Sequence, residues 1–156
     1  MTVWASSTPP DGWTLGVHSL ALAPAGRATG REGGRHGPLH PRPREYGERL
    51  ACRYLLAQGL TILDRNWRCV RGEIDVVARD GTDLVVCEVK TRTTEAFGAP
   101  FEAVTWSKQR RLRRLAGLWR DEHTESARGL ALRIDVISIL RPRSGRARLE
   151  HLRGVC

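Results

Sequence analysis

Two runs of alternating apolar and polar residues lie next to each other in the middle of the chain. Glu73–Ala78 reads EIDVVA, Leu84–Lys90 reads LVVCEVK, and the residues between them include Asp80–Asp83, DGTD. Val and Ile favour a pleated backbone, and Asp-Gly tolerates the positive φ of a tight hairpin turn. The segment Gly72–Arg92 is therefore predicted to form a β-hairpin.

Apolar residues at helical spacing predict two helices, one before and one after the hairpin in the sequence. The first runs over Arg44–Gln58 and ends at Gly59, a residue type that often caps helix C-termini. The second begins after Thr105 or Ser107, whose hydroxyl groups can cap a helix, and runs to about His123. The apolar stripes expected to face the core are Ala51, Cys52, Leu55 and Leu56 in the first helix and Leu112, Leu115, Ala116 and Trp119 in the second.

The remaining apolar runs predict further strands. Leu60–Val70 is expected to be an edge strand that leads into the hairpin, with Trp67 in the core rather than on the surface as a base-stacking platform. Leu130–Leu140 predicts another strand, and Arg148–Leu152 a last edge strand. Between the hairpin and the second helix, Thr91–Ala99 is predicted to be a loop.

The first 43 residues differ in composition from the rest of the chain. They contain seven glycines and six of the eight prolines. Such a segment cannot bury enough surface to offset its ordering entropy, so residues 1–43 are predicted to be a disordered extension and residues 44–156 a single domain. Two alternatives are a loose basic arm for nucleic acid and a true translation start further downstream.

The charge and the cysteine content of the chain bear on its partners and its location. The formal net charge is +9, and nearly all of the positive residues are arginine, which makes planar bidentate contacts with phosphate. Nucleic acid is therefore a candidate partner, although an arginine-rich proteome would give the same balance. The four cysteines fit no zinc pattern, which favours reduced thiols and a cytoplasmic protein, and no apolar run is long enough for a membrane span.

The hairpin places charged side chains together. Side chains alternate along a strand, so Asp75 shares one sheet face with Glu88 and Lys90. A two-residue loop at Gly81-Thr82 puts Asp75 directly opposite Glu88, whereas a loop at Asp80-Gly81 shifts the pairing by one diagonal step. Both registers keep the three charged side chains on the same face.

Two carboxylates in this position need compensation. About 5 Å apart, they repel by roughly 3 kcal/mol at an effective dielectric constant near 20. A divalent cation would offset the repulsion, because Mg²⁺ is held by one or two carboxylates plus waters and phosphate oxygens. The alternative is that Asp75 and Glu88 each pair with a nearby Arg or Lys. Spacing alone leaves both interpretations open.

Other charged residues have candidate roles near this face. Glu48 lies near the middle of the first helix's apolar stripe, where a carboxylate needs a partner, so a role at the metal site is favoured over a helix-edge pair with an Arg. Asp135 is expected to form a buried pair with Arg133 rather than to act as a ligand. Phosphate contact is a hypothesis for the basic residues of the second helix, which are Lys108, Arg110, Arg111, Arg113, Arg114 and Arg120.

From about Tyr46 to Leu140 the chain resembles the YraN family of uncharacterised proteins. The matching residues are Gly47-Glu48, Ala51, Asn66, Gly72-Glu73-Ile74-Asp75, Glu88-Val89-Lys90, Arg92, Phe97-Gly98, Lys108 and Arg133-Ile134-Asp135. That family is similar to the restriction-endonuclease-like (PD-(D/E)XK) nucleases, including archaeal Holliday junction resolvases. The chain departs from the pattern in its long N-terminal extension, in its short C-terminal tail and at Ile74, where many of these nucleases have Pro.

The resemblance implies an α/β, restriction-endonuclease-like three-layer fold, with a central mixed β-sheet flanked by helices. It implies that Asp75, Glu88 and Lys90 are catalytic, with Glu48 as the helical acid. Mg²⁺ or Mn²⁺ is then expected at Asp75, Glu88 and the carbonyl group of Val89. The residues expected to hold nucleic acid are Arg92, Lys108, Arg111 and Arg114.

The expected function is metal-dependent hydrolysis of DNA phosphodiester bonds, selective for branched structure, with a homodimer placing two cuts. The main alternative is a module of nuclease fold that binds nucleic acid without cutting, and a third is a protein-interaction adaptor.

Overall fold

The computed structural model describes residues 18–21, 43–94, 105–142 and 144–155 of the chain. In chain order the elements are β1 (His18–Ala21), α1 (Pro43–Ala57), β2 (Thr61–Cys69), β3 (Gly72–Asp80), β4 (Asp83–Arg92), α2 (Trp106–Glu122), α3 (Thr124–Ala127), β5 (Ala131–Leu140) and β6 (Arg148–Leu152). Thr105 caps α2 through its side chain, as predicted. No helix in this part of the chain is long and apolar enough to cross a membrane.

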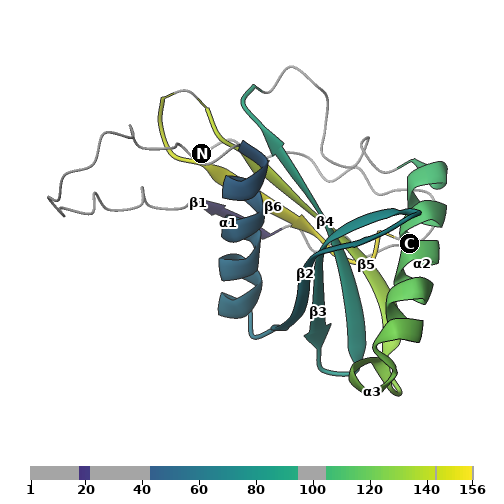
Figure 1. Cartoon of the computed structure of the whole chain (residues 1–156). Helices are drawn as coiled ribbons and strands as arrows, with labels where there is room; N and C mark the ends of the chain where they lie inside the picture. Colours follow the sequence, from purple (N-terminus) through teal and green to yellow (C-terminus); the bar gives the residue numbers. More distant parts are fainter. Residues whose placement is uncertain (1–17, 22–42, 95–104, 143, 156) are drawn as a thin grey trace, which may run out of the picture.

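The strands form one mixed sheet in the order β1-β6-β5-β4-β3-β2 (Figure 1). The central pair, β4 and β5, is parallel, and the other neighbouring strands are antiparallel. The parallel connection contains α2, as is usual for a crossover between parallel strands. The hairpin β3–β4, the edge position of β2 and the strand at β5 are therefore confirmed.

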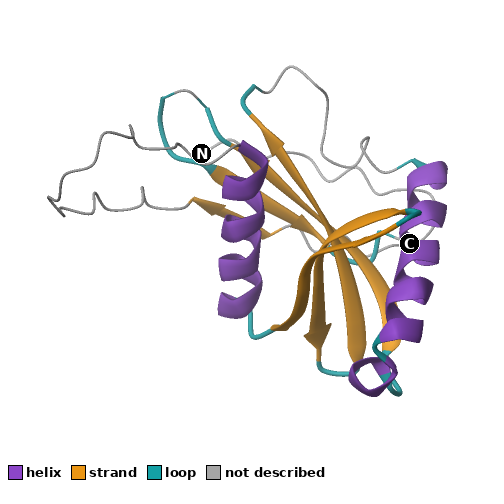
Figure 2. Ribbon diagram, in the orientation of Figure 1, coloured by secondary structure: helices purple, strands orange, loops and turns teal. Residues whose placement is uncertain are grey.

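Two hydrophobic cores lie on opposite faces of the sheet, one under each long helix. Side chains of β4 alternate between them: Val85, Cys87 and Val89 pack toward α1, whereas Leu84 and Val86 pack toward α2. Figure 2 shows the two helices flanking the sheet, which makes three layers. The α/β class and the three-layer arrangement with a central mixed sheet are confirmed, and they are compatible with a restriction-endonuclease-like fold.

Gly47 sets the close approach between α1 and β4. A Cβ atom built at this position would lie 1.9 Å from Oγ1 of Thr91, far inside any real contact distance. The absence of a side chain therefore lets the first turns of α1 lie directly against the end of β4.

Four expectations were wrong in detail. Leu56 is 55% exposed, and the apolar stripe of α1 uses Leu50 and Tyr54 instead. Strand β4 runs to Arg92, so the predicted loop cannot begin at Thr91. The other two corrections concern β1 and β6. Strand β6 was expected at the edge of the sheet, but β1 pairs with it and takes the edge position.

The fourth correction concerns the expected disorder of residues 1–43. It does not hold for His18–Ala21, which form β1. A four-residue strand gives almost no sequence signal, and the ladder of β6 supplies its hydrogen-bonding partners. Residue 43 is the first residue of α1. The rest of the segment lies outside the described residues, as does Phe97-Gly98.

Candidate active site

The β3–β4 register brings the two predicted carboxylates together. Asp80 pairs with Asp83 across the two-residue loop Gly81-Thr82, and the ladder continues to the pair Val76 and Cys87. One step further places Asp75 opposite Glu88, as the first of the two predicted registers requires. The ladder ends there, and Oδ2 of Asp75 accepts a hydrogen bond of 2.8 Å from the backbone N–H of Val89.

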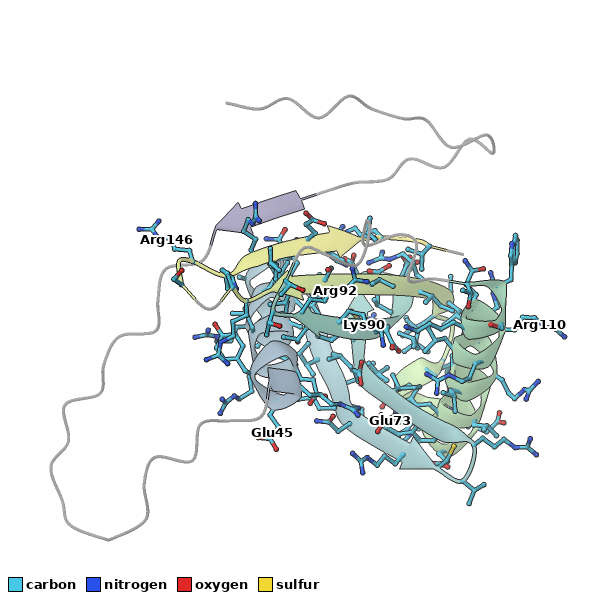
Figure 3. All side chains as sticks on the ribbon, turned by 90° about the horizontal axis from the view of Figure 1, so that it is seen from above. Glu45, Glu73, Lys90, Arg92, Arg110 and Arg146 are labelled. Carbon is cyan, nitrogen blue, oxygen red and sulfur yellow. The ribbon has the colours of Figure 1, made fainter. Side chains whose placement is uncertain are left out.

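These residues line an open cleft of about 490 Å³. Its lining residues are Arg44, Glu73, Asp75, Glu88, Val89, Lys90, Thr91 and Arg111. Figure 3 shows Glu73 and Lys90 between the two long helices, whereas Glu45 points away from the cleft. The structure thus brings together three of the four predicted catalytic residues at the cleft wall, and Glu48 lies just behind them.

The carboxyl group of Asp75 is held in an unfavourable electrostatic position. Asp75 is only 7% exposed, and this burial raises the pKa of its carboxyl group above its usual range. The Val89 N–H and the Arg44 guanidinium oppose the rise, while the Glu88 carboxylate adds to it. A carboxylate in such a position gains from any additional cation.

Glu88 has the opposite balance. Burial also disfavours its ionised form, but two ammonium groups outweigh burial and lower the pKa of Glu88. Nζ of Lys90 lies 2.8 Å and Nζ of Lys108 lies 3.0 Å from the same oxygen, Oε1. Lys108 comes from α2, on the far side of the cleft from α1. Lys108 was predicted to contact nucleic acid; its side chain is 17% exposed and pairs with Glu88.

Arg44 contacts three acidic side chains of the site. Its Nε donates to Oε1 of Glu48 at 2.7 Å, and its Nη2 lies 2.6 Å from Oε1 of Glu73 and 3.0 Å from Oδ1 of Asp75. Hydrogen bonds to Glu48 and Glu73 raise the pKa of Arg44, so the guanidinium remains charged. Glu48 is buried, as predicted, and its observed partner is this arginine.

Each predicted metal-binding carboxylate is therefore paired with a basic side chain, which is the alternative that the sequence left open. Among the described residues, no group of three or more His, Cys, Asp or Glu side chains is arranged to hold a metal ion. The donors still fit Mg²⁺ or Mn²⁺ in a minimal way. Asp75 and Glu88 supply two carboxylates at one open cleft, and Mg²⁺ needs only one or two, with water and phosphate completing its shell.

The helix ends add to the positive character of the cleft. Both α1 and α2 begin at the end of the sheet where β4 ends (Figure 1). Their contacts agree with this placement: Arg44 in the first turn of α1 reaches Asp75, and Lys108 in the first turn of α2 reaches Glu88. Helix N-termini carry partial positive charge and favour anions such as phosphate. The cleft can therefore hold both an anionic group and a cation that neutralises its acids.

The three predicted arginine contacts for nucleic acid lie in three different settings. Arg111 lines the cleft, and its guanidinium would lie 3.4 Å from a Cβ atom at Gly72, so this arginine also touches the β2–β3 hairpin. Arg114 is exposed on α2, outside the cleft lining. Arg92 is half-buried at the end of β4, where its carbonyl oxygen accepts a hydrogen bond of 2.7 Å from the N–H of Arg141.

Sequence reasoning missed Arg44 and Glu73 as site residues. Glu73 carried a signal, because it alternates with Asp75 on the same strand face. Arg44 lies four residues before Glu48, the spacing of a helical ion pair, and that was the only local hint.

Asp135 does not belong to this site. Asp135 is fully buried on β5. The Arg133 guanidinium donates to both of its carboxylate oxygens at 3.1 to 3.4 Å, and Nε2 of His151 lies 3.0 Å from Oδ2. Burial opposes its ionisation, but these two partners lower the pKa of Asp135. The predicted pair with Arg133 is confirmed, and it ties the C-terminal residues to the sheet through the N–H of Gly154.

The fold and the cleft define a three-layer α/β protein with a buried acid pair, flanked by lysines, at the end of its sheet. A profile of the uncharacterised protein family UPF0102 matches residues 47–139. The chain belongs to this family, the UPF0102 (YraN) family, which confirms the resemblance drawn from its motifs.

Three similar proteins from other bacteria are each named UPF0102 protein. One from Beutenbergia cavernae is 60% identical over 110 residues, covering 70% of this chain and 92% of the relative. One from a Nocardioides species is 53% identical over 110 residues, with coverage of 70% and 87%. One from Streptomyces coelicolor is 55% identical over 111 residues, with coverage of 70% and 85%.

Proposed function

We propose that this protein is a metal-dependent endonuclease that hydrolyses phosphodiester bonds in DNA, with selectivity for branched structures. The observation that carries the proposal is the meeting of Asp75, Glu88 and Lys90 at one open cleft. A strained carboxylate, a second carboxylate and a lysine at the end of a sheet suit phosphoryl transfer, where positioning and charge stabilisation do most of the work.

Each residue has a definite task in this proposal. Asp75 and Glu88 would hold Mg²⁺ or Mn²⁺, with the carbonyl of Val89 as a third donor. The bound ion would lower the pKa of a water molecule and polarise the scissile phosphate. Lys90 donates to Glu88 at 2.8 Å, and an ammonium group has three donors, so it keeps others for a phosphate oxygen or the attacking water.

Arg44 and Lys108 occupy the places that ion and substrate would share. Arg44 is shared by Asp75, Glu48 and Glu73, so a metal ion at Asp75 would replace part of its role and free the guanidinium for phosphate. Lys108 fixes Glu88 from the side of α2. Arg92, Arg111 and Arg114 would hold the flanking backbone, and such contacts position the nucleic acid without reading its sequence.

The test is a cleavage panel over branched, flapped, single-stranded and duplex DNA with Mg²⁺ or Mn²⁺. We expect cleavage that chelation abolishes and that is lost in Glu88→Ala, Asp75→Asn and Lys90→Met. Glu45→Gln is the matched control, because Glu45 is an exposed acid on α1 that points away from the cleft (Figure 3). A Glu88→Ala protein that cleaves as fast as the wild type would contradict the proposal.

A second candidate is a nucleic-acid-binding module of nuclease fold that does not cut. The pairing of the acids with basic side chains favours it: Glu88 contacts two lysines, and Arg44 partly compensates the charge of Asp75. Mn²⁺ titration separates the two candidates, because a module whose acids are fully compensated has no need of a metal ion. A homodimer, expected of a junction-cleaving enzyme, is tested by sedimentation of the full chain.

A further inference from the structure

Trp106 is the most exposed aromatic side chain in the described part of the protein. It is 83% exposed, whereas Trp67 and Trp119 are buried and donate their indole N–H groups to Glu122 and Asp64 at 2.9 Å. Tryptophan offers a large flat apolar surface, and leaving it in water forfeits the gain from burying it. A single exposed ring is not by itself evidence of a partner, so the residues around Trp106 decide what it could bind.

Two arginines continue the surface on which Trp106 lies. Arg110 and Arg113 follow Trp106 at i+4 and i+7, so all three share one face of α2. All three are exposed, and Figure 3 shows Arg110 pointing outward from the helix. No acidic residue occurs between Trp106 and Arg120. We call the set Trp106, Arg110 and Arg113 the aromatic–basic stripe.

The stripe begins beside the cleft. Trp106 is the first residue of α2, directly after its cap Thr105, and Lys108 in the same turn reaches Oε1 of Glu88 at 3.0 Å. Two helical residues are only about 3 Å apart along the axis but roughly 200° apart around it, so Trp106 faces away from the side of α2 that Lys108 presents to the cleft. A strand whose phosphate sits in the cleft therefore reaches Trp106 by crossing the N-terminus of α2.

We propose that Trp106 stacks against an unpaired base of the nucleic acid while Arg110 and Arg113 contact the phosphates that follow. This inference rests on the proposed function and deepens it, because it makes the unpaired segment of a branched structure the part that the protein recognises. Aromatic stacking combined with basic backbone contacts is the usual chemistry of single-strand binding. The two arginines beside the ring favour a polyanion over an uncharged protein surface as the occupant of the stripe.

The test measures binding of a fluorescent oligothymidylate and a matched abasic oligomer to the full chain without metal ions. Trp106→Ala is expected to weaken oligothymidylate binding about 5- to 100-fold, the range for loss of base–aromatic stacking, and Trp106→Phe to restore most of it. Binding of the abasic oligomer and of blunt duplex should change less than twofold. Leu56→Ala, which removes an exposed apolar side chain on α1, is the control and should have no effect.

Salt dependence separates stacking from phosphate contact. Trp106→Ala should leave the slope of log K against log salt unchanged, whereas Arg110→Ala and Arg113→Ala should each reduce it by about 0.7 for a single strand. Stacking also predicts that oligothymidylate quenches part of the tryptophan fluorescence of the wild type, and that Trp106→Phe abolishes this part.

Three results would overturn the inference: unchanged oligothymidylate affinity in Trp106→Ala, an equal loss on the abasic oligomer and duplex, or a wild-type dimer that becomes monomeric in Trp106→Ala. In each case the wild type still binds and cleaves, so only the role of Trp106 falls. A wild type that binds no nucleic acid at all would refute the proposed function itself, and this inference with it.

Discussion

The two acids of the cleft are expected to affect stability in opposite directions. Asp75→Asn and Glu88→Gln each remove one negative charge from the same cleft of the same basic chain, so any general effect of net charge is equal in both. The local environments differ: burial raises the pKa of Asp75, whereas the two lysines overcome burial and lower the pKa of Glu88. At neutral pH, Asp75→Asn should stabilise the fold and Glu88→Gln should destabilise it.

The structure gives the size of each effect. Glu88 is 5% exposed and accepts from Lys90 and Lys108 at 2.8 and 3.0 Å, so its replacement leaves two ammonium groups without their counter-charge. Removing one partner of a buried pair costs about 3–5 kcal/mol. Lys90 is 40% exposed and regains hydration, so we expect about 2 kcal/mol, or roughly 8 °C in Tm.

For Asp75→Asn we expect a gain of about 1 kcal/mol, because the amide oxygen still accepts from Val89 while the buried charge is gone. Arg44 keeps Glu48 and Glu73 as partners. In the proposed function Asp75 holds a cation, and a carboxylate kept ready for a ligand is expected to destabilise the fold in its absence.

The pH dependence follows from the direction of each pKa. Because the pKa of Asp75 is raised in the folded protein, its protonated form stabilises the fold. This contribution is fully present below the ordinary pKa, near 4, and is lost as the pH rises through the folded pKa. The lowered pKa of Glu88 means that its contribution is present above the ordinary pKa and is lost as pH falls through the folded value. Both differences from the wild type should therefore be present at pH 7. The difference for Asp75→Asn should vanish below its ordinary pKa, and the difference for Glu88→Gln should shrink as the pH falls.

The assay is urea denaturation of the full chain and both variants at pH 7, 5 and 3. Opposite signs at pH 7 that shrink toward pH 3 would support the assigned electrostatics. Shifts of the same sign at pH 7, or differences that do not shrink as the pH falls, would refute them.

Three further predictions concern the neighbouring contacts. Arg44→Gln should bind Mn²⁺ about fivefold more tightly by calorimetry, because a competing cation is removed; unchanged or weaker binding would argue that Arg44 does not occupy the ion's place. Gly47→Ala should lower the free energy of unfolding by about 1–3 kcal/mol, since its Cβ would lie 1.9 Å from Thr91 Oγ1, and adding Thr91→Ala should recover part of the loss. Asp135→Asn should cost about 3–5 kcal/mol at pH 7 and progressively less in acid, because partners lower the pKa of Asp135; a flat pH profile would contradict this.

Local patterns predicted the parts of the site that neighbouring strands and single helices determine. The Gly81-Thr82 turn and the alternation of β3 and β4 were enough to place Asp75, Glu88 and Lys90 on one face. Helical spacing was enough to bury Glu48. Both arguments depend on contacts that are close in sequence or fixed by one turn.

Long-range contacts were beyond this reasoning. Arg44 meets Asp75 across 31 positions, and Lys108 meets Glu88 from a different layer. Nothing in the local pattern distinguishes an arginine that turns inward from one on a solvated face. The exposure of Leu56 is also set by long-range packing. Leu50, Ala51 and Leu55 form the part of the apolar stripe that packs against the sheet, and Leu56 lies at its edge.

The parallel pairing of β4 with β5 has a consequence for synthesis on the ribosome. A nascent chain that has emerged up to Glu122 already contains the acids and lysines of the cleft, but the partner strand of β4 begins only at Ala131. Until that strand arrives, the middle of the sheet is an open apolar edge, which is prone to pairing with other chains. The complete sheet behind the cleft therefore forms only after nearly the whole polypeptide has been made, so a truncated translation product should aggregate rather than fold.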